Sequence, residues 1–531
     1  MTLDHNPNKN IHLVVLVHGL WGNVNHMNYL ATELESYFKL VEGEKASHRN
    51  EELLIYKASN NEGYKTYDGI DVCGLRVANE IKNIVNGTVG KVTKFSIIGY
   101  SLGGLICRFA IGLLYKDHFF EDNDIDLINF TTFCSPHVGV LAPGTNVAVS
   151  FFNTLVPIVL GNSGKQIFLK DKMSLSGSMP LVYVMSMKNS VFYKALQKFK
   201  YRSLYANVIN DKRTAWWTSG ISKNDPFFDL NERSDIAKFQ YIKGYNPIII
   251  DAEAPINVSD AVNDSDISAT NVQVDDEILT EFYFIDYWAS KLTKWVTVLL
   301  NLLILAPLWL VWFFVYGTLE AFKSTIRVTL VVNKYSQYIV ENLLEENDTL
   351  AIVTNPINDK IVGDEYSSDE DEEENTLCAC TSRSTMASAL SSTDIQTNIE
   401  NSLTDKTDTL LDSVFEAIER KNTVTGLIVP NKTDFKISIK SLELLSIDEI
   451  IEKRKLNKYG ACLLENFRLN ISKMQLEIIE NLNDLEWKKF PVFIRNTKSS
   501  HACAIVRHDD PDFEEGECVV RHWVSEVFKL D

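Results

Sequence analysis

Ser101 stands at the centre of the sequence Gly99-Tyr100-Ser101-Leu102-Gly103, which follows the mainly apolar run Phe95–Ile98 and precedes an apolar segment with helical spacing. A Gly-x-Ser-x-Gly motif between a strand and a helix holds its serine at the apex of a strained turn, where glycine avoids crowding. The helix that follows points backbone N–H groups at an oxyanion forming near the serine. The motif therefore predicts a nucleophilic Ser101; the alternative is a glycine-rich turn whose serine only caps the helix.

A second loop with suitable residues is His18-Gly19-Leu20-Trp21-Gly22, which follows the apolar run Leu13–Val17. Such a run is typical of a strand buried on both faces of a parallel sheet, and sites form where these strands end. We expect the backbone N–H groups of Leu20 and Leu102 to face each other and form an oxyanion hole. His18 is interpreted as a structural loop residue, because a general base in this arrangement comes after the serine.

The acid of a serine triad is expected just beyond a strand, downstream of the nucleophile. Asp211 occupies such a position, because it follows the predicted strand Leu204–Val208. Asp225 and Asp229 are competing candidates on a looser segment that contains a proline. Asp211 is therefore the predicted acid.

The general base is found by elimination, because the sequence has no histidine between His137 and His501. His501 follows a predicted strand and a short polar loop, whereas His508 stands beside two aspartates and is typical of a solvated surface. His522 lies in an amphipathic tail, and His137 belongs to a Ser-Pro-His-x-Gly turn that we interpret as a rigid pocket wall. We predict that His501 accepts the serine proton and that the acid orients the imidazole.

The elements that must position these residues alternate between strand-like and helix-like patterns. Predicted strands are Leu13–Val17, Glu52–Lys57, Phe95–Ile98, Asp126–Phe133, Leu204–Val208 and Trp487–Arg495, and predicted helices include Asn23–Phe38, Tyr67–Val85 and Ser472–Leu485. A further alternating run, Phe435–Leu445, also predicts a strand. This alternation indicates an α/β fold with a mostly parallel central sheet.

Composition limits the classes of function. The chain has 531 residues and 45% hydrophobic residues, enough for a large core, and its formal charge of -19 argues against a nucleic-acid partner. Its eight cysteines show no paired spacing, so we expect no metal site, no disulfide framework and a cytosol-facing protein. The polar N-terminal residues lack the apolar core of a signal peptide, and we expect no secretion by the standard route.

Trp295–Gly317 is an uncharged stretch of 23 residues, and as a helix it would extend about 35 Å against a hydrocarbon core of about 30 Å. A single crossing would separate Ser101 from His501. We therefore predict a re-entrant or interfacial membrane segment that bends near Pro307; a buried core helix is the alternative. The shorter apolar run Val147–Leu160 fits a lid or interfacial helix near the pocket.

These patterns divide the chain into five parts. They are an N-terminal hydrolase-like part (10–225), a polar insertion (226–290), a membrane-associating segment (291–325), a mostly acidic, low-complexity and disordered region (326–407) and a C-terminal part that completes the core (408–531). The acidic run around 367–374 also suits serine phosphorylation.

Five segments resemble the serine esterase/lipase family of fungi and plants, whose yeast members include a lipid-droplet phospholipase and a monoacylglycerol lipase. They are VVLVHGLWGN, IIGYSLGGLICRFAIG, FCSPHVGV, YANVINDKRTAWWTSGI and FPVFIRNTKSSHACAIVR, and the resemblance covers roughly residues 10–225 and 430–531. It implies an α/β-hydrolase fold, no cofactor, a lipid acyl-ester substrate, and Ser101, Asp211 and His501 as nucleophile, acid and base.

The leading hypothesis is a phospholipase that acts on a lipid-droplet or endoplasmic-reticulum membrane surface facing the cytosol. A monoacylglycerol lipase is the nearest alternative, and a thioesterase or acyltransferase could use the same acyl-enzyme. A non-catalytic membrane adaptor with a hydrolase fold is the alternative of another class.

Overall fold

The computed structural model describes residues 9–44, 51–142, 147–172, 179–211, 213–227, 237–258, 315–329 and 435–531. Residues 330–407 of the predicted acidic low-complexity region and residues 295–314 of the apolar stretch lie outside these ranges.

A six-stranded sheet forms the centre of the molecule, in the order β2-β1-β3-β4-β5-β9, and all neighbouring pairs are parallel. The strands are β1 (Asn10–Val17), β2 (Glu51–Lys57), β3 (Lys91–Tyr100), β4 (Asp126–Phe133), β5 (Tyr201–Asn207) and β9 (Lys488–Val492). Each coincides with a predicted strand. Because the strands run in the same direction, the loops after β1, β3, β5 and β9 open at one edge of the sheet.

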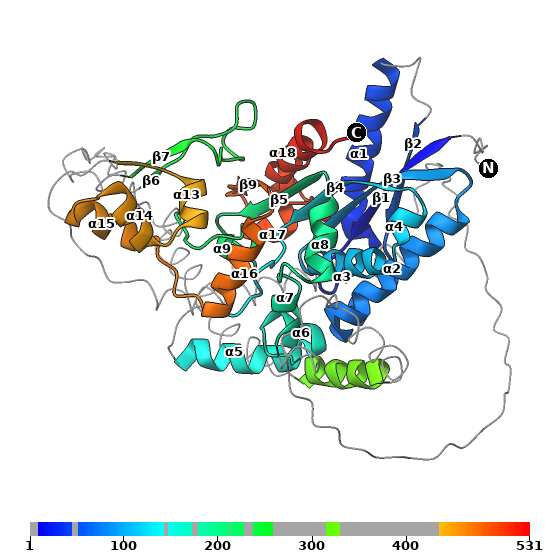
Figure 1. The fold of residues 1–531 in the computed structure, drawn as a ribbon, viewed down its shortest axis with the longest axis horizontal. Coiled ribbons are helices and arrows are strands. Elements are labelled where there is room, and N and C mark those ends of the chain that lie inside the picture. Colours follow the sequence, from blue (N-terminus) through cyan, green and yellow to red (C-terminus); the bar gives the residue numbers. More distant parts are fainter. Residues whose placement is uncertain are drawn as a thin grey trace, which may run out of the picture.

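Helices cover both faces of this sheet (Figure 1). One layer contains α2 (Ile70–Gly87), α3 (Leu102–Lys116) and α8 (Val191–Lys198); the other contains α1 (Asn28–Glu44) and α18 (Glu514–His522). Alternate residues of β1 enter the two cores: Leu13 and Val15 face the first, Val14 and Leu16 the second. The uninterrupted apolar run of this strand therefore reflects burial on both faces, as predicted.

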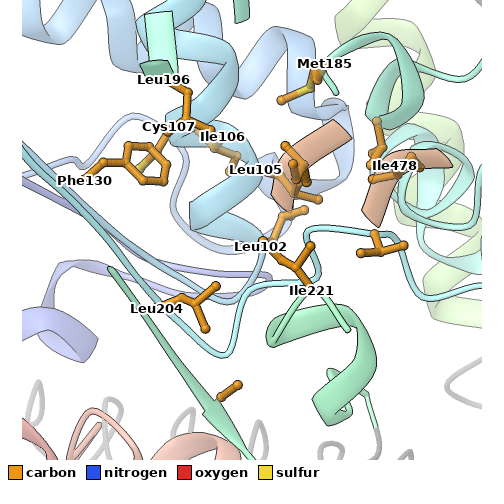
Figure 2. Packing of buried hydrophobic residues seen from close by; sticks show 14 of the residues in the cluster. Leu102, Leu105, Ile106, Cys107, Phe130, Met185, Leu196, Leu204, Ile221 and Ile478 are labelled. Carbon is orange, nitrogen blue, oxygen red and sulfur yellow. The ribbon is translucent and has the colours of Figure 1, made fainter. Parts of the chain in front are cut away.

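The first core is built around α3. Figure 2 shows Leu102, Leu105 and Ile106 of this helix in one cluster with Phe130 of β4 and Leu204 of β5. All five side chains are at most 3% exposed. The helix that follows the predicted nucleophile is therefore fixed along its length by the sheet.

Shorter elements connect and extend this framework. They are η1 (Val24–Met27), η2 (Gly63–Asp68), α4 (Phe119–Asp122), α5 (Val147–Val159), α6 (Gly161–Ile167), α7 (Leu181–Val184), α9 (Trp216–Ser219), α14 (Ile447–Arg454), α15 (Lys458–Glu465), α16 (Lys473–Asn483), α17 (Ser500–Cys503), η4 (Pro511–Phe513) and η5 (Trp523–Val527). The predicted helix over Ser472–Leu485 corresponds to α16, whose cap Ser472 accepts a hydrogen bond from the Gln475 N–H.

The C-terminal residues join the central sheet through β9, which pairs with β5 from Ser203↔Lys488 to Asn207↔Val492. A small antiparallel sheet lies beside them and consists of β6 (Ala237–Lys238), β7 (Pro255–Val258) and β8 (Phe435–Ser438). The N-terminal and C-terminal parts of the chain thus share one sheet, through pairing of β5 and β9, which are far apart in sequence.

The prediction of a strand over Phe435–Leu445 is wrong for its second half. Residues Ile439–Leu444 form the helix α13, because the Ser438 side chain accepts the Ser441 N–H at 3.2 Å and caps a helix there. The alternating pattern did not reveal this local cap.

Residues 315–329, at the end of the predicted membrane segment, form a helix beside α5 and α6 (the yellow-green ribbon in Figure 1). Among the helices that the structure describes, none is both long enough and apolar enough to cross a membrane.

The parallel sheet, its two helical layers and the sharp turn between β3 and α3 together constitute an α/β-hydrolase fold. The predicted fold class is confirmed.

Candidate active site

Ser101 lies in a strained turn between β3 and α3. Its backbone has φ 55° and ψ -127°, a conformation that residues other than glycine rarely adopt. The Ser101 N–H donates to the Phe133 carbonyl at 2.8 Å, so the turn is held by the neighbouring strand. A Cβ at position 99 would lie 2.6 Å from the Gly104 nitrogen, which explains why this position is glycine. The motif thus presents its serine as predicted.

The loop after β1 lies directly on this turn. A Cβ placed on Gly19 would come within 2.7 Å of Ser101 Cβ, and one placed on Gly103 would come within 2.2 Å of the Val17 carbonyl oxygen. This close approach brings Leu20 and Leu102 to the wall of the same cavity. The first N–H groups of a helix have no partner within it, so the Leu102 N–H can stabilise an oxyanion.

Asp211 and His501 are in direct contact. His501 Nδ1 lies 2.7 Å from Asp211 Oδ2, and the two residues are only 3% and 4% exposed, respectively. With Nδ1 donating to the carboxylate, Nε2 is the ring nitrogen that can accept a proton. The structure therefore brings together the predicted acid and base, which are 290 residues apart.

Further donors hold the Asp211 carboxylate. Oδ1 accepts the Thr214 N–H at 3.1 Å, and Oδ2 accepts the Thr214 hydroxyl at 2.9 Å and the Asn207 amide at 3.2 Å. Burial alone would raise the pKa of Asp211, but the charge and hydrogen bond of His501 outweigh it and hold the pKa below its usual range. The carboxylate is therefore ionised and available to stabilise an imidazolium.

Contacts from neighbouring residues orient His501. The Tyr100 hydroxyl donates to the His501 carbonyl at 3.1 Å, and the two rings lie 5.0 Å apart. The Ser500 hydroxyl donates to the Ile209 carbonyl at 3.1 Å, which ties the histidine segment to the loop of the acid. His501 lies in the helical turn α17, so it has less freedom than the loop position that we predicted.

One cavity contains Ser101, His501 and the predicted oxyanion donors. Its lining residues are Leu20, Trp21, Tyr100, Ser101, Leu102, Pro136, Val140, Val156, Leu160, Ile167, Phe168, Arg213, Thr214, His501 and Arg507. The wall is mainly apolar, with a few polar groups near the serine, as expected for an apolar ligand with one reacting polar centre. Val156 belongs to α5, so the run Val147–Leu160 forms a helix at the pocket.

The other histidines occupy structural positions. His18 Nδ1 lies 3.0 Å from the Gly19 oxygen, and His137 Nε2 lies 2.9 Å from Thr132 Oγ1; both residues are at most 1% exposed. Burial lowers the pKa of each imidazole, so neither favours the charged form.

The two alternative bases also lie elsewhere. His522 Nδ1 is 2.7 Å from the Tyr205 hydroxyl, and burial lowers its pKa to about 4. His508 Nε2 lies 3.7 Å from Asp510 and is half-buried rather than fully solvated.

Of the two alternative acids, the structure describes Asp225. Asp225 Oδ1 accepts the Phe227 N–H at 2.9 Å, a local turn contact. Asp229 lies outside the described residues.

Within the described residues, one group of side chains has metal-like spacing, namely Cys134, Asp211 and His501, whose ligand atoms lie within 4.8 Å of one another. His501 Nδ1 already contacts the carboxylate, and burial raises the pKa of the Cys134 thiol, which disfavours the thiolate that binds metals. The geometry fits an acid–base pair better than a metal centre.

Sequence reasoning missed several residues of the site. Thr214 bonds to the acid and lies 3.1 Å from His501 Nδ1, and Arg213 and Arg507 line the cavity. The Asp-x-x-Thr spacing was a usable signal, because an aspartate commonly caps a turn through a nearby N–H. Nothing local marked Arg507, which reaches the cavity only through the fold.

Part of this chain is similar to known proteins. Residues 7–223 match a family described as "Putative serine esterase (DUF676)", and this range includes Ser101 and Asp211. The resemblance predicted from the motifs is confirmed over this part of the chain.

Yeast proteins are similar over about half of this chain. "Putative lipase ROG1" and "Putative lipase YDL109C" of Saccharomyces cerevisiae are 29% and 30% identical over 254 and 262 residues, which cover 47% and 48% of this chain. "Putative lipase C4A8.10" of Schizosaccharomyces pombe is 28% identical over 221 residues. The matched residues span only 34% and 37% of the first two relatives.

Solved structures that match part of this chain include phospholipase PlaB from Legionella pneumophila, which is 13% identical, with a TM-score of 0.21 and coverage of 38% of this chain and 40% of that one. An extracellular α/β-hydrolase from a Paenibacillus species is 14% identical, with a TM-score of 0.19 and coverage of 37% and 78%.

Proposed function

We propose that this protein hydrolyses acyl esters of lipids through an acyl-enzyme on Ser101, a proposal supported by the match of residues 7–223 to a serine esterase family. The proposal depends on one observation: a strained serine and the histidine of a buried Asp–His pair line the same apolar cavity. Such a cavity suits an acyl chain, whose burial provides binding energy of about 0.8 kcal/mol per CH₂.

In the proposed reaction, His501 Nε2 takes the Ser101 hydroxyl proton while Oγ attacks the ester carbonyl carbon. The N–H groups of Leu20 and Leu102 stabilise the oxyanion, and the tetrahedral intermediate collapses as His501 returns the proton to the leaving alcohol. Water then attacks the acyl-enzyme by the same route, which releases the fatty acid and restores Ser101. Asp211 holds the imidazole tautomer throughout and stabilises the imidazolium.

A phospholipid is the substrate class that the cavity favours within this proposal. Arg213 and Arg507 both line the cavity that contains Ser101, and a guanidinium has five N–H donors that match phosphate oxygens. A monoacylglycerol has no anionic group for such residues, so monoacylglycerol lipase remains the second candidate. A membrane or lipid-droplet surface facing the cytosol is the proposed location, supported by the apolar stretch Trp295–Gly317.

Labelling with a fluorophosphonate probe tests the proposal, combined with product analysis on phosphatidylcholine, lysophosphatidylcholine and monoacylglycerol. We expect the wild-type protein to label and to release fatty acid, and Ser101→Ala to do neither while keeping its melting temperature. His501→Gln is expected to retain the Ser101 hydroxyl but to label at least about a thousand-fold more slowly. Labelling of Ser101→Ala at the wild-type rate would exclude Ser101 as the nucleophile. A wild-type protein that does not label would favour the alternative of a non-catalytic membrane adaptor with a hydrolase fold.

A further inference from the structure

The helix over residues 315–329 has its apolar side chains turned outward. Val315, Leu319, Phe322 and Ile326 are 54%, 53%, 66% and 48% exposed. Their spacing of four, three and four residues places them on one face of a helix. We call these four side chains the apolar stripe.

The opposite face of this helix is turned toward the protein, where Ala321 packs on the core beside several polar side chains. Glu320 and Ser324 are 6% and 0% exposed, and the Ser324 hydroxyl donates to Asp68 Oδ1 at 2.7 Å. Arg327 Nη2 donates to the same oxygen at 2.9 Å, and the Asp68 side chain is fully buried. Arg76 reaches Asp68 Oδ2 at 2.6 Å.

This orientation is the reverse of that of an ordinary surface helix, which turns its apolar face to the core. Ser324 and Arg327 reach the buried Asp68 because their face of the helix points inward. Their hydrogen bonds help to offset the free-energy cost of burying the carboxylate, which is several kcal/mol for a carboxylate without partners. The ion pair therefore fixes the stripe in its outward position.

The helix that carries the stripe packs on α5, a helix that contributes to the wall of the cavity. A Cβ at Gly317 would lie 2.4 Å from Val159 Cγ1, so the helix packs closely on α5. At the end of α5, Val156 and the following residue Leu160 line the cavity, whereas Ile158 between them is 51% exposed. The same short segment thus contributes to the cavity wall and to the outer apolar surface.

From this arrangement we propose that the apolar stripe and Ile158 form the surface that docks on a lipid layer and brings the cavity mouth to it. The inference rests on the lipid substrate proposed above, and it assigns the part of the molecule that meets the lipid. A lipid layer is favoured over a protein partner because the surface borders a cavity suited to acyl chains. The stretch 295–314 that leads into the helix is also uncharged.

Sedimentation with phosphatidylcholine vesicles tests this surface. The full chain carrying Ser101→Ala is used, so that no lipid is consumed, with and without Leu319→Asn and Phe322→Asn together. We expect the double substitution to lower the vesicle partition coefficient about tenfold or more, because two large apolar side chains no longer enter the lipid. High salt is expected to leave the partition of the parent unchanged, because the stripe carries no charge.

Leu40→Asn is the matched control. Leu40 is 61% exposed on α1, which lies at the opposite end of the molecule from α5 (Figure 1), and its substitution should leave the partition unchanged. Melting temperatures of all variants verify that they are folded.

The proposal is overturned if the double variant sediments with vesicles as strongly as its parent. It is also overturned if the double substitution converts a dimer to a monomer without changing the vesicle partition, since a second copy would then cover the stripe. Sedimentation does not depend on hydrolysis, so failure of the proposed ester chemistry would be seen separately, in the labelling and product assays.

Discussion

At the scale of single residues, the site depends on conformations that ordinary residues avoid. Ser101 has a positive φ of 55°, and such a conformation persists only where the surroundings hold it. Here the Phe133 carbonyl and the loop at Gly19 provide that constraint. The strain keeps the hydroxyl at the cavity instead of turned into the α3 N-terminus as a cap.

Asp211 shows how a buried charge is retained at the site. Its carboxylate accepts hydrogen bonds from His501, Thr214 and Asn207, so the cost of burial is offset in the ionised form. The Thr214 hydroxyl bonds to the acid and lies next to the base, which makes it a positioning residue for the pair.

Arg213 lines the cavity, and its substitution tests whether the substrate carries a phosphate group. Arg213→Gln should lower kcat/KM for a phospholipid about tenfold to a hundredfold relative to a monoacylglycerol, because a hydrogen bond to a charged group contributes about 1.5–3 kcal/mol. The measurement is the ratio of the two kcat/KM values. The ratio matters because the charge of Arg213 also lowers the pKa of Asp211, and this effect is common to both substrates.

Arg202→Gln is the matched control, because Arg202 donates to the Gln197 carbonyl at 3.2 Å and does not line the described cavity. A constant ratio in Arg213→Gln would contradict phosphate recognition by this residue and favour the monoacylglycerol lipase.

At the scale of elements, the turn between β3 and α3 depends on close contact between backbones. Gly103 lies in α3, where an alanine would ordinarily stabilise a helix by about 0.5–1 kcal/mol. Here, however, a Cβ would lie 2.2 Å from the Val17 carbonyl oxygen and 2.6 Å from that of His18. These are backbone atoms at the end of β1 and the start of the loop His18–Gly22, here called the oxyanion loop, and they cannot rotate away as a side chain could.

Gly103→Ala is therefore expected to lower the free energy of unfolding by about 1–3 kcal/mol and to displace the oxyanion loop. Chemical denaturation measures the first effect, and the rate of fluorophosphonate labelling measures the second.

The control is Gly87→Ala at the end of α2, where a Cβ would meet nothing within 4 Å. That change should be neutral or stabilise slightly. Equal stability of the Gly103→Ala and Gly87→Ala variants would contradict the close contact between the backbone at Val17 and His18 and the turn between β3 and α3.

Local sequence patterns predicted some strands and helices of this protein correctly and others not. The apolar runs of β1, β3, β4 and β5 were sufficient to place these strands, because burial on both faces leaves a continuous signal. The run Phe435–Leu445 was misread in its second half because the serine cap at Ser438 outweighed the alternation. The inward polar face of the 315–329 helix was not predicted, because its partner Asp68 is distant in sequence.

At the scale of the whole molecule, the fold constrains how the chain can meet a membrane. β9 pairs with β5 in the central sheet, and Ser101 and His501 line one cavity. The parts before and after residues 295–314 must therefore lie on the same side of any membrane. A single crossing by this stretch is incompatible with the sheet.

Protease protection on intact membranes tests this topology in the full chain with a different epitope at each end. We expect protease on the cytosolic side to cleave both epitopes and protease on the opposite side to cleave neither. The reason is that β1, near one end of the chain, and β9, near the other, belong to one sheet. A lumenal marker protein controls for membrane integrity. Protection of one epitope alone would contradict the common location of the serine and the histidine.

The sequence by itself predicted the nucleophile motif at Ser101, the succession of strands and helices in the β/α part, the acid after a strand and, by elimination, the base at His501. These follow from local chemistry, since turns, apolar periodicity and residue type are readable within a few residues.

Only the tertiary structure decided the 2.7 Å contact between His501 and Asp211, the two arginines at the cavity and the outward direction of the apolar stripe. The physical reason is that each depends on packing between segments that are distant in sequence. Pairing of β5 with β9 and the buried Asp68–Arg327 ion pair bring these segments together, and no local pattern encodes either contact.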